Sequence, residues 1–229
     1  PLTGLILAGG AGRRVQGADK AWLSWQDRPL IEQIEARLTP QVTQLWISAN
    51  RDPARYTAQL GSRLAGVIGD DWPDYPGPLA GIASCLSSLP TGWVLITPVD
   101  TPLLPTDLGE QLWHGLAAAG SGSRMAVAGM GDDTHWLHML VHTDLAAGLQ
   151  QRLQAGERRV RDWCQAEQAV RVVIEATPDS FANLNRLEHL IGVLSRAESL
   201  ARRYVITGTA ADLARFHIHF DHLTIADRV

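Results

Sequence analysis

The chain is constrained most strongly by an alternation of short apolar runs with segments of helical periodicity. Apolar runs of strand length lie at residues 4–8, 44–48, 65–68, 93–97, 125–128, 137–142 and 170–174. Apolar side chains recur at helical spacing in residues 29–38, 79–89 and 105–119, and Thr106 is a suitable N-cap for the third of these segments. This alternation predicts an α/β domain with a mostly parallel, twisted sheet and helices on both faces.

Two regions of the chain follow different patterns. The strand–helix rhythm continues to about residue 190, whereas residues 186–203 form one long amphipathic segment and residues 204–229 have no clear rhythm. We therefore expect one domain over residues 1–190 and a C-terminal helix and appendage over 191–229. Functional residues of the domain should lie in the loops that follow the carboxyl ends of its strands.

Composition narrows the functional classes. Hydrophobic residues make up 45% of the chain and charged residues 19%, which is enough apolar material for a buried core. The formal net charge of −4 argues against a surface that binds nucleic acid. No apolar run approaches the roughly 18 residues of a membrane span, and Cys85 and Cys164 fit no metal-ligand spacing. We expect a cytoplasmic protein with no membrane or nucleic-acid partner.

A glycine-rich loop follows the first apolar run. It comprises Gly9, Gly10 and Gly12 and is followed by Arg13 and Arg14. Glycines allow backbone N–H groups to approach an anion, and arginine offers forked donors to phosphate. The dinucleotide-binding fingerprint is excluded because position 15 is valine. The Walker A pattern is excluded because Lys20 comes three residues after Gly17. An ordinary tight turn with exposed arginines is the simpler alternative.

Six motifs together resemble one enzyme family. LAGGAGRRVQGADKAWL resembles the opening motif of nucleotidyltransferases that activate sugars, isoprenoid precursors and molybdopterin, and its Asp-Lys pair is similar to that of the molybdenum cofactor guanylyltransferases. The motifs that agree with this family in order and spacing are ISANR (47–51), DYPGPLAGI (74–82), PVDTPLLPTDL (98–108), AGERRV (155–160) and FANLN (181–185). The resemblance covers about residues 3–190.

This resemblance implies a Rossmann-like nucleotidyltransferase fold and a specific reaction. The family transfers GMP from GTP to molybdenum-loaded or metal-free molybdopterin, releases pyrophosphate and forms the guanine dinucleotide cofactor. Magnesium is the implied cofactor, and GTP and molybdopterin are the implied substrates. A molybdenum-insertion protein and apo-molybdoenzymes or their chaperones are further implied partners.

The resemblance also implies roles for individual residues at the nucleotide end of the site. Arg14 and Lys20 would neutralise charge on the phosphates, and Asp100 would be both catalytic and the magnesium ligand. The residues that would hold the nucleotide itself are Leu7, Ala8, Gly9, Gly10 and Gly12.

Other positions carry implied contacts with open alternatives. Either Asp70 or Asp71, and either Ser48 or Asn50, would contact the nucleotide, and Gly77 would lie in a turn near the guanine or the reacting phosphate. On the pterin side the family implicates Arg158, Asn183 and Asn185. Asn183 and Asn185 lie two apart and would share one face of an extended segment. His135 falls where the family has a His-Pro pair, but Trp136 follows it here.

Simpler roles remain for the charged candidates, and other functions remain for the chain. Lys20 could be a solvated surface lysine, Asp100 a turn residue, and Arg158 with Arg159 a solvated helix face. Alternative enzymes are a CTP-dependent molybdopterin cytidylyltransferase and a sugar-phosphate nucleotidyltransferase. A non-catalytic protein that delivers cofactor is a third alternative. The Asp19-Lys20 pair and FANLN favour GTP.

One pattern near the C-terminus suggests metal but is better explained without it. His217, His219, Asp221 and His222 resemble the H-x-H-x-D-H zinc motif of metallo-β-lactamase-fold hydrolases. That fold needs further ligands downstream, and seven residues remain. A strand with one polar face accounts for the pattern.

Overall fold

The computed structural model describes residues 1–9, 19–72, 77–120 and 122–185. The chain divides into two compact units, Pro1–Ala182 and Asn183–Val229. The predicted C-terminal helix, the appendage and the histidine pattern at 217–222 lie outside the described residues, as do Gly10, Gly12 and Arg14.

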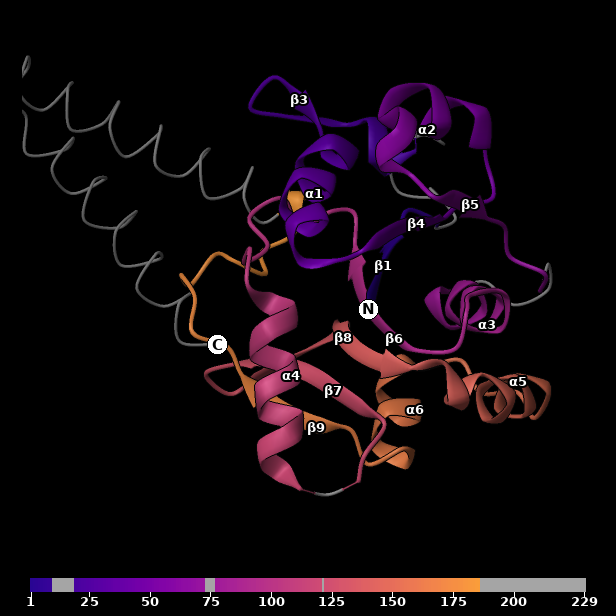
Figure 1. Cartoon of the computed structure of the whole chain (residues 1–229), viewed down its shortest axis with the longest axis vertical. Coiled ribbons are helices and arrows are strands. Elements are labelled where there is room, and N and C mark those ends of the chain that lie inside the picture. Colours follow the sequence, from indigo (N-terminus) through magenta and orange to yellow (C-terminus); the bar gives the residue numbers. More distant parts are fainter. Residues whose placement is uncertain (10–18, 73–76, 121, 186–229) are drawn as a thin grey trace, which may run out of the picture. The chain divides into compact units, whose positions relative to one another are not determined.

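The first unit is built on a seven-stranded sheet in the order β5-β4-β1-β6-β8-β7-β9 (Figure 1). Among the strands of this sheet that the structure describes, only β8 runs antiparallel to its two neighbours, so the prediction of a mostly parallel sheet is confirmed. A separate two-stranded hairpin pairs β2 (Ser24–Trp25) with β3 (Arg28–Pro29). The strands of the main sheet are β1 (Leu2–Leu7), β4 (Gln44–Ser48), β5 (Gly66–Ile68), β6 (Trp93–Pro98), β7 (Met125–Met130), β8 (Asp133–His142) and β9 (Val170–Val173).

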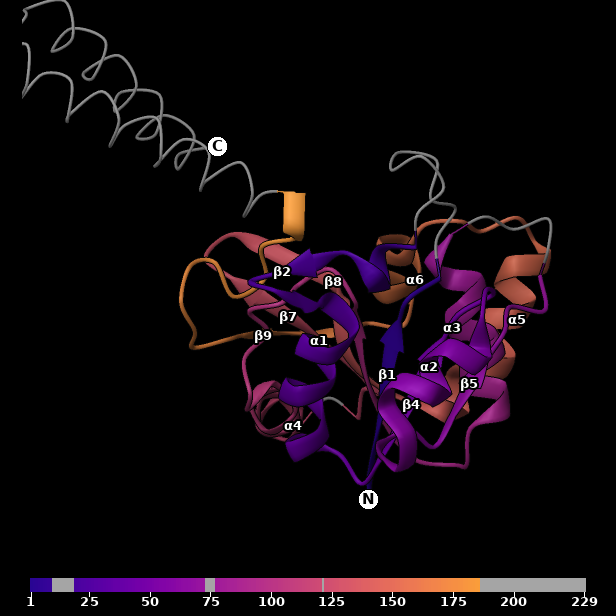
Figure 2. The same ribbon diagram turned by 90° about the horizontal axis from the view of Figure 1, so that it is seen from above.

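Helices cover both faces of this sheet (Figures 1 and 2). Helices α3 (Pro78–Ser88), α5 (Ala146–Gln154) and α6 (Val160–Ala166) contribute to one apolar cluster. Helices α1 (Leu30–Leu38) and α4 (Leu108–Ala119) pack on the opposite face. Helix α2 (Pro53–Leu60) follows β4.

Two differences from the sequence prediction concern helices. Thr106 is not the N-cap of α4, because residues 105–108 form a turn in which the Leu108 N–H donates to the Pro105 carbonyl, and the helix begins at Leu108 after Asp107. The sequence did not predict α2, α5 or α6. Helices α2 and α5 each bury only two side chains, which is too weak an apolar stripe to recognise.

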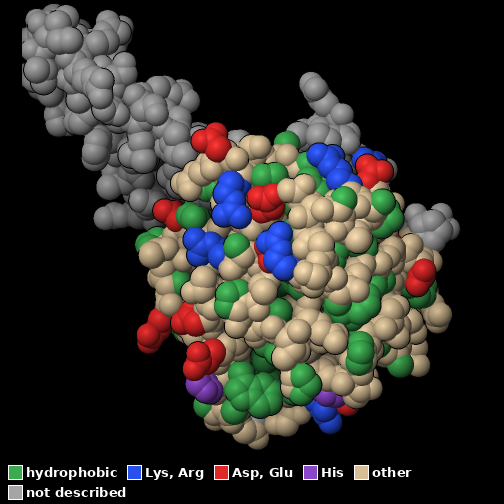
Figure 3. All heavy atoms as spheres, turned by 45° about the horizontal axis from the view of Figure 1, so that its top comes forward, with side chains coloured by type: hydrophobic (Ala, Val, Ile, Leu, Met, Phe, Trp, Pro, Cys, Tyr) green, Lys and Arg blue, Asp and Glu red, His purple; other side chains and the backbone are tan. Residues whose placement is uncertain are grey.

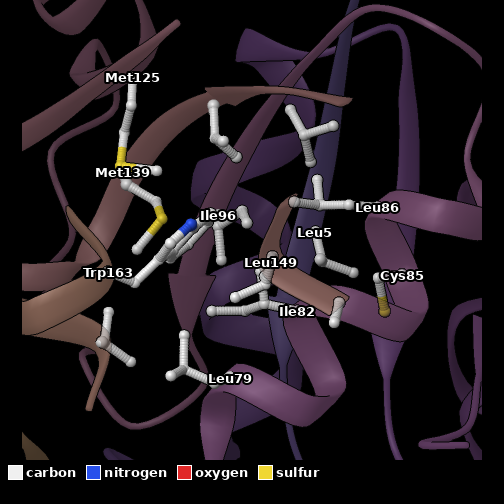
Figure 4. Packing of buried hydrophobic residues seen from close by; sticks show 14 of the residues in the cluster. Leu5, Leu79, Ile82, Cys85, Leu86, Ile96, Met125, Met139, Leu149 and Trp163 are labelled. Atoms are coloured by element: carbon white, nitrogen blue, oxygen red, sulfur yellow. The ribbon is translucent and has the colours of Figure 1, made fainter. Parts of the chain in front are cut away.

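The apolar cluster joins the sheet to α3, α5 and α6 (Figure 4). Alternate residues of the central strands, such as Leu5 in β1 and Ile96 in β6, point into it, as the two-residue period of a strand requires. From the helices come Ile82 of α3, Leu149 of α5 and Trp163 of α6, all fully buried. This packing fixes the helices against the sheet and so fixes where the loops leave it.

Strand β8 carries a wide irregularity where it passes the end of β6. Met139 pairs with Val127 of β7, whereas His135 pairs with the next residue, Ala128. Trp136, Leu137 and His138 therefore have no partner on β7. Bulges redirect side chains and are common beside functional sites.

The surface mixes charges of both signs. On the face drawn in Figure 3, Lys and Arg side chains lie beside Asp and Glu side chains, with apolar side chains between them. Among the described residues, no helix is long and apolar enough to cross a membrane.

Candidate active site

Four parallel strands end level with one another and bring the predicted loops together. Leu7 pairs with both Ser48 and Pro98, and Ser48 pairs with Ile68. The residues that follow, including Gly9, Asn50, Asp70 and Asp100, therefore leave the same edge of the sheet. Figure 2 shows this edge above the arrowhead of β1, which runs upward from the N-terminus. The prediction that the site lies at the carboxyl ends of the strands agrees with this arrangement.

Asp100 and Lys20 form an ion pair at this edge. The Lys20 Nζ atom lies 2.8 Å from Asp100 Oδ2, although the residues are 80 apart in sequence. Their side chains are 44% and 20% exposed, so both can reach a ligand. Asp100 follows the buried Val99, whose N–H donates to the Leu7 carbonyl and extends the β1–β6 pairing to the residue before the carboxylate.

Lys20 is held by a short 3-10 helix, η1 (Lys20–Trp22). Asp19 caps this helix by accepting from the Ala21 N–H, and its other oxygen accepts from the Tyr56 hydroxyl of α2 at 2.8 Å. Burial and this hydrogen bond raise the pKa of Tyr56 above its usual value. The centroid of the Trp22 ring lies 5.0 Å from that of the Tyr56 ring. The Arg55 guanidinium lies over the Trp22 ring, 3.9 Å from its centroid. Asp19 and α2 therefore position Lys20, a role that the sequence analysis did not assign.

The start of the glycine loop is bonded to β4. The N–H groups of Ala8 and Gly9 both donate to the Ser48 carbonyl, at 3.0 and 2.9 Å. These two amides are thus engaged within the protein, and Leu7 is buried as the last residue of β1. A Cβ on Gly9 would meet backbone atoms only at ordinary contact distance, the nearest at 3.6 Å. The described part of the fold therefore does not require glycine at this position.

The nucleotide candidates on β4 and β5 separate by exposure. Ser48 is 5% exposed, and its hydroxyl contacts the thiol of Cys85, whose pKa burial raises to about 12. Asn50 is exposed, and its Oδ1 accepts from the Asp70 N–H at 2.6 Å. Asp70 accepts in turn from the Trp72 N–H through Oδ1, and burial raises the pKa of its carboxyl. Exposure therefore favours Asn50 over Ser48, whereas of the two aspartates Asp71 is exposed and Asp70 is partly buried beside Asn50.

The remaining predicted positions lie on loops. Gly77 precedes α3 with φ of 144°, a backbone conformation that favours glycine. Arg158 and Arg159 are exposed and precede α6 rather than lying on a helix face. Asn183 and Asn185 are exposed residues of the second unit.

A buried histidine beside Asp100 was not predicted as a site residue. His138 is 4% exposed, and its Nε2 lies 3.1 Å from the hydroxyl of Thr101, itself 3% exposed. Burial, with a smaller contribution from His135, lowers the pKa of His138 to about 3. Only its place in the folded bulge reveals it, because nothing in the local sequence separates it from other histidines.

Asp100 is the carboxylate that pairs with Lys20, and it could hold a metal ion together with a substrate's phosphates. Among residues 1–9, 19–72, 77–120 and 122–185, no group of three or more His, Cys, Asp or Glu side chains could hold a metal ion. Magnesium fits such a site, since it is often bound by one or two carboxylates together with substrate phosphates and water. The ammonium group of Lys20 on Asp100 is a cation at the position where the metal would bind.

A cavity of about 490 Å³ lies elsewhere. Its lining includes Leu2, Trp93 and Trp113, at the amino ends of β1 and β6 and on α4, and none of the predicted site residues. The chemistry of Asp100 and Lys20 therefore identifies the candidate site, and the cavity does not.

The buried His138 predicts acid sensitivity. The unfolded chain takes up a proton near the ordinary pKa of 6.5, whereas the folded protein resists it until about 3. Stability from this group is therefore complete above pH 6.5 and falls as the pH decreases, by about 2 kcal/mol at pH 5. Urea titrations at pH 7.5 and at pH 5 give the free energy of unfolding at each pH. Between the two, the wild type should lose about 2 kcal/mol more of this free energy than His138→Gln does. The matched control is His114→Gln, on the exposed face of α4, which should behave as the wild type. Equal losses in all three proteins would contradict the assignment.

Comparison with known proteins identifies the family of this chain. The model of the MobA-like NTP transferase domain matches residues 4–172. The molybdenum cofactor guanylyltransferase of Pasteurella multocida is 40% identical over 82% of this chain and 97% of its own length. The enzyme of the same name from Cereibacter sphaeroides is 42% identical over 88% of this chain and 98% of its own length.

Solved structures show the same fold at low identity. Molybdopterin-guanine dinucleotide biosynthesis protein A from Archaeoglobus fulgidus has a TM-score of 0.61 at 20% identity, over 85% of this chain and 99% of that one. The 4-diphosphocytidyl-2C-methyl-D-erythritol synthase of Anaerococcus prevotii has a TM-score of 0.59 at 10% identity, over 83% and 94%. The chain therefore belongs to the molybdenum cofactor guanylyltransferases, a family of nucleotidyltransferase enzymes with a MobA-like NTP transferase domain.

Proposed function

We propose that this enzyme transfers GMP from GTP to molybdopterin, with or without its molybdenum, and releases pyrophosphate. The observation that supports this most directly is the Lys20–Asp100 pair, at 2.8 Å on the carboxyl edge of the sheet, in a chain 40% identical to a guanylyltransferase over 97% of that enzyme. The pair would offer one cationic group to the triphosphate and one anionic group to the metal.

The reaction needs positioning and charge neutralisation more than covalent help. A terminal phosphate oxygen of molybdopterin attacks the α-phosphorus of GTP in line, and the α–β bridging P–O bond breaks with its electron pair leaving on pyrophosphate. Asp100 would hold magnesium, which when bound neutralises phosphate charge. Lys20 would stabilise the charge that accumulates on the leaving pyrophosphate, and Arg14 would share this role.

Substrate contacts are assigned on the same basis. Gly9, with Leu7, Ala8, Gly10 and Gly12, would lie against the nucleotide. Asn50 is the exposed candidate of its pair, so we assign it rather than the buried Ser48. Of the two aspartates we assign Asp70, because its N–H is hydrogen-bonded to Asn50. Gly77 would lie near the guanine or the reacting phosphate. Arg158, Asn183 and Asn185 would contact the pterin and its phosphate.

Wider roles remain part of the proposal. Residues 1–190 would form the catalytic domain, with 191–229 as an accessory segment. A molybdenum-insertion protein and apo-molybdoenzymes or their chaperones would be the partners on either side of the reaction. The enzyme would act in the cytoplasm.

Nucleotide preference tests the proposed substrate. GTP with magnesium should raise the melting temperature more than ATP, CTP or UTP, because a ligand at a hundred-fold excess over its Kd stabilises the folded state by about 2.7 kcal/mol. The measurement is thermal unfolding with each nucleotide, followed by detection of pyrophosphate when molybdopterin is added. A larger shift with CTP would favour the cytidylyltransferase alternative. GTP binding without pyrophosphate release would favour a protein that only delivers cofactor.

A further inference from the structure

The carboxylate of Asp100 is borne by a turn in which the residues on both sides of it, Val99 and Thr101, are buried. The turn spans residues 98–101 and leaves the sheet after the Val99 N–H bonds to Leu7. Asp100 is partly exposed, and Lys20 is its ion-pair partner. The Thr101 hydroxyl lies 3.3 Å from the Pro98 carbonyl and closes the turn across Asp100. The Leu104 N–H also donates to the Thr101 carbonyl, so Thr101 is the residue through which the turn is held on this side, and the direction of the carboxylate depends in part on it.

His138 holds Thr101 from the adjacent strand. Met139 pairs with Ile96 of β6, and the same register carried one residue further brings His138 level with Thr97, directly before the turn. The bulge spans residues 136–138, and it leaves His138 without a pairing partner on β7. Its Nε2 then lies 3.1 Å from Thr101 Oγ1. The bulge and the contact with Thr101 thus occur at the same residue.

The direction of each hydrogen bond follows from what each group can donate. The Pro98 carbonyl can only accept, so the single proton of the Thr101 hydroxyl goes to it. His138 must then donate its Nε2 proton to Thr101 Oγ1. Burial keeps the ring neutral, which leaves it one N–H for this bond. The result is a continuous relay from His138 through Thr101 to Pro98, which spans Asp100.

Phe181 fixes the other side of the histidine. Its ring lies 4.8 Å from that of His138 at 69°, and it stacks on His135 at 4.4 Å and 25°. Phe181 is 6% exposed and belongs to the FANLN motif. His138 is thus clamped between an aromatic side chain and the turn that bears Asp100, and it has little freedom to rotate.

We propose that His138 is a positioning residue, which through Thr101 holds the turn at residues 98–101 and so directs the Asp100 carboxylate at the metal and the phosphates. This inference rests on the proposed function, because it takes Asp100 as the metal ligand. His138 itself contacts neither substrate nor metal. A core histidine that only fills space would contribute to stability alone and leave the metal affinity unchanged.

The test compares variants that break or keep the two bonds at nearly constant volume. His138→Leu and Thr101→Val remove a hydrogen bond, whereas His138→Gln and Thr101→Ser retain a polar group. Met139→Leu is the matched control, since Met139 is fully buried on β8 next to His138. Folding is checked by thermal unfolding of each full-length protein. Mn²⁺ affinity is measured by water-proton relaxation in the presence of a GTP analogue with an α,β-methylene bridge.

We expect His138→Leu and Thr101→Val to weaken Mn²⁺ binding about three- to ten-fold, and His138→Gln, Thr101→Ser and Met139→Leu to stay within about two-fold of the wild type. The double variant should be no worse than either single one, because both act through one relay. The magnesium activation constant should rise in parallel while the KM for GTP changes little.

Two results would count against different claims. If folded Thr101→Val and His138→Leu bind Mn²⁺ as tightly as Met139→Leu, the positioning role is refuted. If Asp100→Asn also binds Mn²⁺ as the wild type does, the metal role of Asp100, and with it the proposed function, is what fails.

Discussion

Asp100→Asn should lower turnover by about 10²- to 10³-fold at saturating magnesium, the loss typical of removing one electrostatic contact made in a transition state. Asparagine preserves the shape of the side chain and removes the charge that would hold the metal. Stability should change by about 1 kcal/mol or less, because the ion pair with Lys20 is partly exposed and solvent screens it. The measurement is pyrophosphate release together with the melting temperature.

The control for this change is Asp107→Asn. Asp107 is an exposed aspartate before α4, lining the cavity at the opposite edge of the sheet. It loses the same charge and should keep the wild-type rate. A folded Asp100→Asn protein with near wild-type turnover would show that Asp100 does not hold the catalytic metal.

The fold was predictable where burial on both faces dictated the sequence. Strands β1, β4 and β6 are covered by helices, and their sequences are therefore mostly apolar runs. The ends of these three strands were predicted within two residues. Helix α4 was placed too early because proline and threonine at 105–106 suit a helix start as well as the turn that forms. Short helices such as α2 depend on contacts from distant residues, which no local pattern records.

The sequence predicted at which edge of the sheet the candidate residues gather, but not which of them contact one another. Parallel strands bring their carboxyl ends together, so a glycine loop after one strand and an aspartate after another had to meet at one edge. The choice between Ser48 and Asn50 depended on Gly81, where a Cβ would lie 2.7 Å from Ser48 Oγ, so α3 packs close enough to enclose that hydroxyl. The link between His138 and Thr101 depends on a bulge that shifts register, and residue spacing cannot reveal it.

Lys20→Met should lower kcat by about 10²-fold through the loss of charge that would stabilise the leaving pyrophosphate. Methionine keeps much of the length of the side chain, and Asp19, Trp22 and Tyr56 hold the backbone of η1 independently of the ammonium group. The fold should therefore persist. Lys20→Arg retains the charge and should recover part of the rate, whereas an exposed surface lysine would show no such dependence.

Metal affinity separates Lys20 from the residues that act on Asp100. The Lys20 ammonium lies 2.8 Å from Asp100 Oδ2 and would therefore compete with a metal cation for that oxygen. Lys20→Met should therefore bind Mn²⁺ at least as tightly as the wild type when the relaxation measurement is made without the GTP analogue, although it turns over slowly. Asp100→Asn should instead lose both properties together. Weaker Mn²⁺ binding by a folded Lys20→Met protein would mean that Lys20 supports the metal site rather than competing for it, and its role at the leaving group would have to be reassigned.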